Sequence, residues 1–406
     1  MSNHGETVRQ DRRRLRTGLA FLRVFLFFCL IVWLFFQFSL QLRATREAGA
    51  GLNRVAVSPL NLPFTGVTVM LEDSTAAERN EMLARLQDSG FGWVRQRFDW
   101  GALEPSLGEY DWSQSDEMIT AIDDAGLTPI VVLDGSPTWA RSAADLVPTD
   151  NPLAPPADPI DFARFAAEFG RRYGDHVRYY QIWHEPNIAP HWGNRHIEPV
   201  HYAQLLIAAS QAIHSVDEDA VILTAALAPT ADRGHTAMDE VTYLRRLYAA
   251  GIRPYVDAVA VEPYGFGYSA GDTRHRQDVL NFQRVAWVRR AMLAAGDGET
   301  PLVATSYGWN RWPASPWRTV TQENQRQYLA DALEIGWAGW PWLAGMGWAV
   351  DQPAAATDDP LWGFALDDTL LAVFTDWANP DPGPRSGLEV NFSWHMMLLF
   401  VSMAIV

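Results

Sequence analysis

The sequence contains no lysine and a single cysteine, Cys29, in 406 residues. One cysteine excludes a disulfide framework and a thiolate metal site, and its place in an apolar stretch indicates packing. All 32 basic residues are arginines, and 48 acidic residues outnumber them, which gives a net charge of −16. This acidic balance argues against nucleic acid as a partner. With 48% hydrophobic and 20% charged residues, the chain is typical of a globular protein.

Two kinds of cofactor motif are also missing. No glycine-rich nucleotide fingerprint follows the first predicted strand, which disfavours a doubly wound nucleotide-binding sheet. The histidines show no ligand spacing, because His191 and His196 are five residues apart in a predicted loop, near no acidic group that suggests zinc. The sequence therefore predicts no metal and no cofactor.

The N-terminal segment carries the clearest topological signal. Five arginines between residues 9 and 16 precede residues 18–40, which are apolar apart from three positions. At about 1.5 Å per residue, such a helix crosses a hydrocarbon core of about 30 Å. We expect a cytoplasmic tail at 1–17, a transmembrane anchor at 18–41 and a linker at 42–59, with the following domain outside the cell membrane. The alternative is a signal peptide cleaved near residues 48–50.

The C-terminal segment is apolar as well. Residues 396–406 are hydrophobic except for Ser402, and eleven residues are too few to span a bilayer. The segment 391–406 is therefore either a buried strand or helix or the first half of a second membrane helix. A stretch with several prolines and glycines precedes it, and we expect a loop at 376–390.

Between these ends, short apolar runs alternate with segments of helical character. Eight strands are expected, at residues 66–70, 92–98, 128–133, 177–183, 220–225, 256–261, 301–305 and 346–350. Seven helices are expected between them, at residues 75–88, 114–125, 160–173, 200–215, 238–250, 276–295 and 321–336. Strands that are apolar and not alternating are typical of a parallel sheet, and eight β/α repeats favour an α/β (β/α)8 TIM barrel over residues 60–375.

A carboxylate ends the fourth predicted strand. Glu185 closes a short apolar run and is followed at once by Pro186, so the strand cannot continue as paired sheet. Burial of an ionised carboxylate is costly, which favours a functional role, the alternative being an ordinary surface ion pair. Trp183 and Trp192 lie nearby in the sequence, and saccharides stack on aromatic faces.

The other strand ends carry polar and aromatic residues, and these ends are where barrel enzymes place their chemistry. They include Arg95, Arg97, Asp134, Trp139, Glu262, Tyr264, Ser306, Tyr307, Trp309, Trp348 and Asp351. Taken singly, Asp134 and Asp351 are expected to form ion pairs at the rim. Several carboxylates among aromatic residues indicate acid/base work on a neutral polymer, and two carboxylates across a cleft are the minimum for glycoside hydrolysis.

Four motifs carry a resemblance to a known family. They are residues 91–112, with Glu104 and Trp112, residues 136–140 (Ser-Pro-Thr-Trp-Ala), residues 182–187 (Ile-Trp-His-Glu-Pro-Asn) and residues 301–309. In order and spacing they resemble the second, third, fourth and seventh units of retaining glycoside hydrolases with a (β/α)8 barrel. The resemblance is to the β-xylosidase and α-L-iduronidase-like branch, which includes membrane-linked glycosidases of exopolysaccharide systems. It covers roughly residues 60–350.

The resemblance implies roles for the matched residues. Glu185 takes the place of the general acid/base, and Arg95 that of the arginine that steadies the nucleophile. The implied partner is a cell-surface or exported polysaccharide or oligosaccharide. Candidates for aromatic contact with the sugar are Trp139, Trp192, Tyr264, Tyr307, Trp309, Trp312 and Trp348.

Three departures from the family pattern affect the chemistry. His184 stands where the family usually has Asn, and it either tunes the pKa of Glu185, binds a sugar hydroxyl or simply fills the Asn site. Glu262 stands where a His is common on the sixth strand, and Ser306 stands where the nucleophilic Glu is required. A serine hydroxyl without an adjacent base is a poor nucleophile toward an acetal carbon and cannot stabilise an oxocarbenium ion by charge.

Three interpretations remain open at this point. In the first, Glu262 has taken over the role of second carboxylate, and a separation from Glu185 of about 5 Å would allow retention, one of about 6.5–9.5 Å inversion. In the second, the domain is an inactive pseudo-glycosidase that still binds glycan, with Ser306 in the nucleophile position. In the third, the barrel is a scaffold for membrane assembly. The sequence identifies no protein partner.

Overall fold

The computed structural model describes residues 21–36, 60–146, 150–232, 234–274 and 276–378. The chain divides into two compact units, Met1–Asn53 with Val390–Val406, and Arg54–Glu389. In the first unit, residues 21–36 are helical and their apolar side chains are mostly exposed. No helix among the described residues is both long and apolar enough to cross a membrane. The remainder of the predicted anchor and the apolar C-terminal segment lie outside the described residues.

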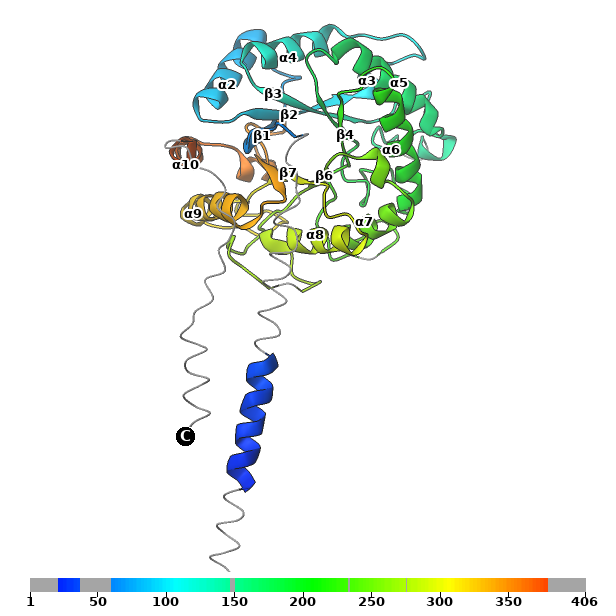
Figure 1. Ribbon diagram of the computed structural model, residues 1–406. Helices are drawn as coiled ribbons and strands as arrows, with labels where there is room; N and C mark the ends of the chain where they lie inside the picture. Colours follow the sequence, from blue (N-terminus) through cyan, green and yellow to red (C-terminus); the bar gives the residue numbers. More distant parts are fainter. Residues whose placement is uncertain (1–20, 37–59, 147–149, 233, 275, 379–406) are drawn as a thin grey trace, which may run out of the picture. The chain divides into compact units, whose positions relative to one another are not determined.

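In the second unit, eight parallel strands form one sheet in the order β5-β4-β3-β2-β1-β8-β7-β6 (Figure 1). They are β1 (Thr65–Val69), β2 (Trp93–Asp99), β3 (Thr128–Asp134), β4 (Tyr179–Ile182), β5 (Val221–Leu223), β6 (Val259–Val261), β7 (Leu302–Tyr307) and β8 (Leu343–Trp348). Because β1 pairs with both β2 and β8, the first and last strands are neighbours. Single parallel bridges, Leu223 to Ala258 and Leu227 to Val261, join the β5 and β6 segments. The predicted barrel is therefore confirmed, as a nearly closed cylinder.

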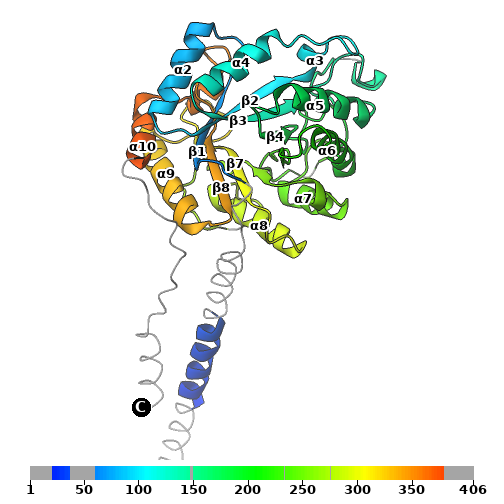
Figure 2. The same cartoon turned by 45° about the horizontal axis from the view of Figure 1, so that its top comes forward.

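Helices connect successive strands and cover the outside of the barrel, as Figures 1 and 2 show. They are α2 (Ala76–Asp88), α3 (Trp100–Leu103), α4 (Ser113–Asp124), α5 (Pro159–Tyr173), α6 (Pro199–His214), α7 (Glu240–Ala249), α8 (Val285–Ala294), α9 (Gln322–Glu334) and α10 (Asp368–Ala378). The local sequence determines the residues at which these helices begin. Thr75 and Glu78 form a capping box at α2, and Asp158 caps α5, which has proline in its first turn.

Several predicted boundaries differ from the structure by a few residues, the eighth strand for example lying at Leu343–Trp348 and not at 346–350, and two differences concern helices. The helix expected over residues 276–295 is confined to α8, because side chains bind the main chain before it. Asn281 donates to the carbonyls of Asp272 and Arg274, and Arg284 donates to carbonyls of residues 276–279. At the other end, α10 continues through Ala378, three residues into the segment expected to be a loop.

The barrel interior is packed with apolar side chains near the amino ends of its strands. This inner core consists mainly of Trp93, Ile130, Tyr179, Val221, Leu223, Ala258, Ala260, Val303 and Ala344. Trp93 needs two glycines beside it, because a Cβ on Gly66 would lie 2.0 Å from the indole ring and one on Gly347 2.4 Å from it. The polar residues of the strands lie beyond this core, toward the carboxyl ends.

Candidate active site

A buried amide links the second and fourth strands. Gln181, on β4, accepts a hydrogen bond from Arg95 Nε on β2 at 3.0 Å and donates to the carbonyl of Trp183 at 2.9 Å. Arg95 also donates through Nη2 to Nδ1 of His184, at 3.1 Å. The guanidinium and the turn that follows β4 are therefore fixed relative to each other.

The turn after β4 presents Glu185 to the cavity in a strained backbone. Trp183 and Glu185 both have left-handed φ values, 69° and 46°, and such a residue costs on the order of 1 kcal/mol or more. The surroundings enforce the turn, since the N–H of Trp183 donates to Leu133 and that of Glu185 to Ala226, both at 2.9 Å. The side chain of Asn187 holds the same turn to the segment that follows β5.

Glu185 and Glu262 meet at the carboxyl ends of β4 and β6. The two carboxyl groups are close enough for each to affect the pKa of the other. Neither oxygen of Glu262, whose side chain is 1% exposed, has a hydrogen-bond partner among the described residues. Burial raises the pKa of Glu185. Burial and the neighbouring charge of Glu185 raise the pKa of Glu262 well above its usual range, so Glu262 is the acid that keeps a proton more firmly.

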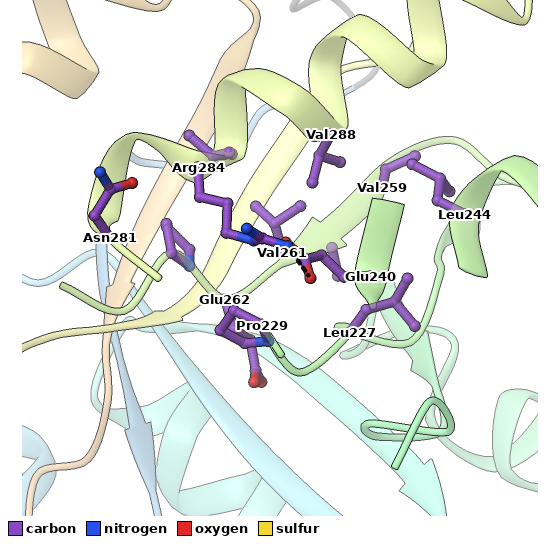
Figure 3. Close-up of a pocket in the computed structure, with 13 residues that line it drawn as sticks. Leu227, Pro229, Glu240, Leu244, Val259, Val261, Glu262, Asn281, Arg284 and Val288 are labelled. Carbon is purple, nitrogen blue, oxygen red and sulfur yellow. Dashed lines mark hydrogen bonds and ion pairs between the residues drawn. The ribbon is translucent and has the colours of Figure 1, made fainter. Parts of the chain in front are cut away.

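Arg284, which lines a small cavity together with Glu262, does not neutralise Glu262. It forms a buried ion pair with Glu240 beside this cavity of about 20 Å³. Figure 3 shows this pair as a dashed contact and shows the carboxyl group of Glu262 pointing away from both residues. The carboxyl of Glu262 therefore meets Glu185 without a direct cationic partner.

Two histidines flank the carboxyl pair. His191 Nδ1 lies 3.0 Å from Glu185 Oε2, and His184 places Nε2 3.9 Å from that oxygen and Nδ1 3.5 Å from Glu262 Oε1. Burial lowers the pKa of both rings, that of His184 well below its usual value with Arg95 adding to the effect. The expectation that His191 has no acidic neighbour is wrong, because the loop folds back and Trp183 Nε1 binds the carbonyl of His191 at 2.8 Å.

His184, Glu185 and His191 are close enough to hold a metal ion, since their ligand atoms lie within 4.8 Å of one another. The hydrogen bonding favours a proton instead. Because Arg95 donates to Nδ1 of His184, the neutral ring carries its own proton on Nε2, the atom that faces Glu185. A cation here would also meet the guanidinium of Arg95, and we assign no metal to this cluster.

Ser306 lies on β7, and its hydroxyl is 2.6 Å from the phenol oxygen of Tyr264. Burial, followed by the charge of Glu262, raises the pKa of Tyr264. The phenol therefore stays protonated and cannot accept the serine proton as a base. The pair offers hydroxyl groups for binding and lacks the means to make Ser306 a nucleophile.

A cavity of about 810 Å³ opens over Glu185 and its neighbours, and Glu262 lies outside the lining of this cavity. Its polar lining includes Arg95, His184, Glu185, His191 and Ser306. Its apolar lining, which the sequence did not reveal, includes Met70, Ile188, Phe266, Leu280, Trp317, Leu361 and Phe364. Trp317 is 39% exposed and its ring centroid lies 6.1 Å from that of Phe364. An exposed indole at a cavity wall suits the apolar face of a sugar.

Of the aromatic residues predicted to contact sugar, Tyr264 lines the cavity and the others lie outside its lining. The rings of Trp192, Tyr307, Trp309 and Trp348 are buried, and Trp139 packs on Trp100; Trp312 is partly exposed. Two of the buried rings support the wall from behind. Trp309 Nε1 donates to the carbonyl of Tyr268 at 2.6 Å, and Trp348 Nε1 donates to that of Phe364 at 2.7 Å.

The two acidic residues expected at the barrel rim form the expected ion pairs. Asp134 contacts Arg97 at 2.5 Å, and Asp351 contacts Arg85 at 2.5 Å. Both therefore have structural partners, and neither lines the cavity.

No protein-family model matches this sequence, and no curated protein sequence matches it. Solved structures share its fold. A family 39 glycoside hydrolase from Bacteroides cellulosilyticus WH2 aligns with a TM-score of 0.58 at 18% identity, over 78% of this chain and 64% of that one. A monomeric beta-xylosidase from Caulobacter crescentus CB15 gives 0.57 at 18% identity, over 81% and 70%. An endo-beta-1,4-glucanase from Xanthomonas axonopodis pv. citri gives 0.53 at 14% identity, over 78% and 99%.

Proposed function

We propose that this chain is a glycoside hydrolase in which Glu185 is the general acid/base and Glu262 is the second carboxyl group. The observation that carries the proposal is the pair of neighbouring buried carboxyl groups, with Glu185 in the cavity lining and Glu262 next to it. Enzymes with this barrel do their chemistry at the carboxyl ends of the strands. Most glycoside hydrolases use a pair of carboxyl groups to hydrolyse the glycosidic bond. The likeness to glycoside hydrolase structures supports the same function.

In the proposed reaction, the two acids share one proton, which moves to Glu185 as substrate separates the pair and leaves Glu262 as an anion. Glu185 gives the proton to the glycosidic oxygen while the bond from that oxygen to the anomeric carbon breaks. Two neighbouring carboxyl groups are closer to the separation of about 5 Å that is typical of retaining enzymes than to the separation of about 6.5–9.5 Å that is typical of inverting enzymes. Glu262 therefore bonds to the anomeric carbon, and water then attacks that carbon, returns a proton to Glu185 and releases Glu262.

The other cavity residues bind and orient the sugar in this proposal. Arg95 lies close enough to lower the pKa of both carboxyls, against the effect of burial. Its charge therefore keeps the shared proton transferable. The hydroxyl groups of Ser306 and Tyr264 bind sugar hydroxyls, and Trp317 stacks on a ring face. The substrate class we propose is a cell-surface or exported polysaccharide.

The test is turnover of aryl glycosides and polysaccharides by the purified full-length chain, with Glu185→Gln and Glu262→Gln compared with wild type. We expect each variant to lose about 100-fold or more in kcat, the scale of general acid/base catalysis, with product of retained configuration by NMR. Asp351→Asn is the matched control, because it changes a buried carboxyl outside the cavity lining. Full turnover by Glu262→Gln, or by Glu185→Gln, would overturn the assignment of that residue.

A second function, glycan binding without hydrolysis, has one observation in its favour. The resemblance of residues 301–309 implies that Ser306 stands at the position of the nucleophile, and Ser306 is hydrogen-bonded to Tyr264, which cannot activate it. A folded chain that turns over no glycoside, yet binds a polysaccharide in calorimetry and loses that binding in Trp317→Ala, would establish this second function in place of the first.

We also propose that residues 18–41 anchor the chain in the cell membrane and that the barrel lies on the outer side. The arginine-rich segment before a long apolar stretch supports this orientation. A protease added to intact cells should digest the barrel while an N-terminal tag stays protected. Digestion only after lysis would reverse the proposed orientation.

A further inference from the structure

The loop residue His191 has a role beyond that of lining the cavity. We propose that it is a positioning residue for Glu185, which fixes the carboxyl oxygen that carries the transferable proton. This inference rests on the proposed function. It concerns a residue that no motif of the sequence assigned, and that reaches Glu185 because the loop after β4 folds back on itself.

The main chain at His191 is firmly held. Its carbonyl accepts from Nε1 of Trp183 at 2.8 Å. The indole of Trp183 is fully buried, with ring centroids 5.4 Å from Trp192 and 5.7 Å from Phe162. Because Trp183 is two residues from Glu185, the same indole anchors both partners of the contact.

Nδ1 of His191 and Oε2 of Glu185 lie 3.0 Å apart, a distance at which a hydrogen bond forms when the neutral ring carries its proton on Nδ1. Glu262 holds the proton of the carboxyl pair, which leaves Glu185 as the acceptor. His191 therefore donates from Nδ1 to Oε2, and His184 turns its Nε2–H toward the same oxygen from 3.9 Å.

The charged groups around His191 keep its ring neutral. Besides Glu185 and His184, those that act on it are Glu262 beyond β6, Asp134 at the end of β3 and Arg97 on β2. Burial lowers the pKa of His191 and outweighs the two acids, which oppose it. A neutral donor orients Glu185 without adding the positive charge that would keep the carboxyl ionised, as an arginine would.

One geometric consequence follows for the reaction. Oε2 of Glu185 is committed to accepting from His191, so a proton on Glu185 sits on Oε1. Glu185 then protonates the glycosidic oxygen from one defined atom. Without His191 the carboxyl can turn, and either oxygen can take the proton. We therefore expect His191 to affect kcat more than KM.

The test compares His191→Phe, which keeps a ring and removes the donor, with His191→Asn, which restores an N–H. We expect His191→Phe to lower kcat about 10- to 100-fold with little change in KM. We also expect it to raise the pKa of Glu185 by about one unit, seen in the pH profile and in infrared titration of the carboxyl band. His191→Asn should recover most of both effects. His196→Asn, in the same loop but exposed, is the control.

Failure of this inference is distinguishable from failure of the proposed function. If wild type turns over no glycoside, the function fails, while the carboxyl titration, assigned with Glu185→Gln, still tests His191. The inference is overturned if folded His191→Phe keeps the wild-type carboxyl titration and, in an active enzyme, the wild-type pH profile. Thermal unfolding identifies a variant that has simply lost its fold, and His191→Asn then carries the test.

Discussion

Among the described residues, no arginine contacts the carboxyl groups of Glu185 and Glu262 directly. Arg95 directs its hydrogen bonds to Gln181 and His184, and Arg284 is paired with Glu240. Two like charges this close cannot both ionise in a buried site. Protonation thus replaces ion pairing as the way this barrel accommodates two acids.

Position 306 offers a prediction for a single residue. Ser306→Glu introduces the residue type that the resembled family has there, as a third acid close to the pair. We expect kcat to fall at least tenfold, because added negative charge raises the pKa values of its neighbours and hinders ionisation of Glu262. Ser306→Ala, which loses only the contact with Tyr264, should change kcat less than fivefold. A gain of hydrolysis in Ser306→Glu, measured on an otherwise inactive wild type, would instead favour the pseudo-glycosidase.

The residues of the candidate site differ in how readily they can be predicted from the sequence. Glu185 can be predicted, because a carboxylate between an apolar strand and a proline needs a reason to be there. His191 cannot, since its contact depends on the path of a loop and on one indole hydrogen bond. The buried tryptophans were predicted to contact sugar for a related reason. A tryptophan in a core and one on a cavity wall look alike until the burial of each is known.

Among the elements, β1, β2 and β8 make a packing unit that predicts a stability effect. Gly347→Ala forces a methyl group against the Trp93 ring, and we expect a loss of about 1–3 kcal/mol in the free energy of unfolding. Gly271→Ala is the matched control, since its Cβ would meet no heavy atom within 4 Å. Urea unfolding measures both. Equal stability of the two variants would contradict this account of the inner core.

The elements themselves were largely visible in the sequence. Apolar runs of four to seven residues mark strands buried on both faces, and their number pointed to the barrel. The segment before α8 was misread because apolar spacing does not reveal that Asn281 and Arg284 bind its carbonyls. α10 was not foreseen because its apolar residues follow the last expected strand. Phe374 shows why it forms, since its ring packs on Phe91 with centroids 4.4 Å apart.

For the molecule as a whole, the buried acids and histidines predict how stability varies with pH. Burial raises the pKa values of Glu185 and Glu262, so their contribution is complete below the unfolded value near 4.5 and is lost as pH rises through the folded values. Burial lowers the pKa values of His184 and His191, so their contribution is complete above about 6.5 and is lost as pH falls through the folded values.

Of the two acids, Glu262 has the more strongly raised pKa, so it contributes the larger loss of stability as pH rises. Glu262→Gln removes this loss. We expect this variant to unfold at a higher temperature than wild type at pH 8, by roughly 2–4 °C for each kcal/mol recovered. The two proteins should converge near pH 4, where Glu262 is protonated in both states. Calorimetric scans between pH 4 and 9 measure this, and parallel curves over that range would show that Glu262 does not titrate with folding.

We expect the barrel to open transiently at the junction between β5 and β6. Single bridges join the two segments there, and the N–H of Ala260 binds the hydroxyl of Thr224 in place of a main-chain carbonyl. The N–H of Glu185 donates to the carbonyl of Ala226, which follows β5 on one side of the junction, and Glu262 follows β6 on the other side. If this junction widens, Glu185 and Glu262 move apart, which would make room for substrate between them. We therefore expect deuterium to enter these amides before those of the other strands, and a bound saccharide to slow it.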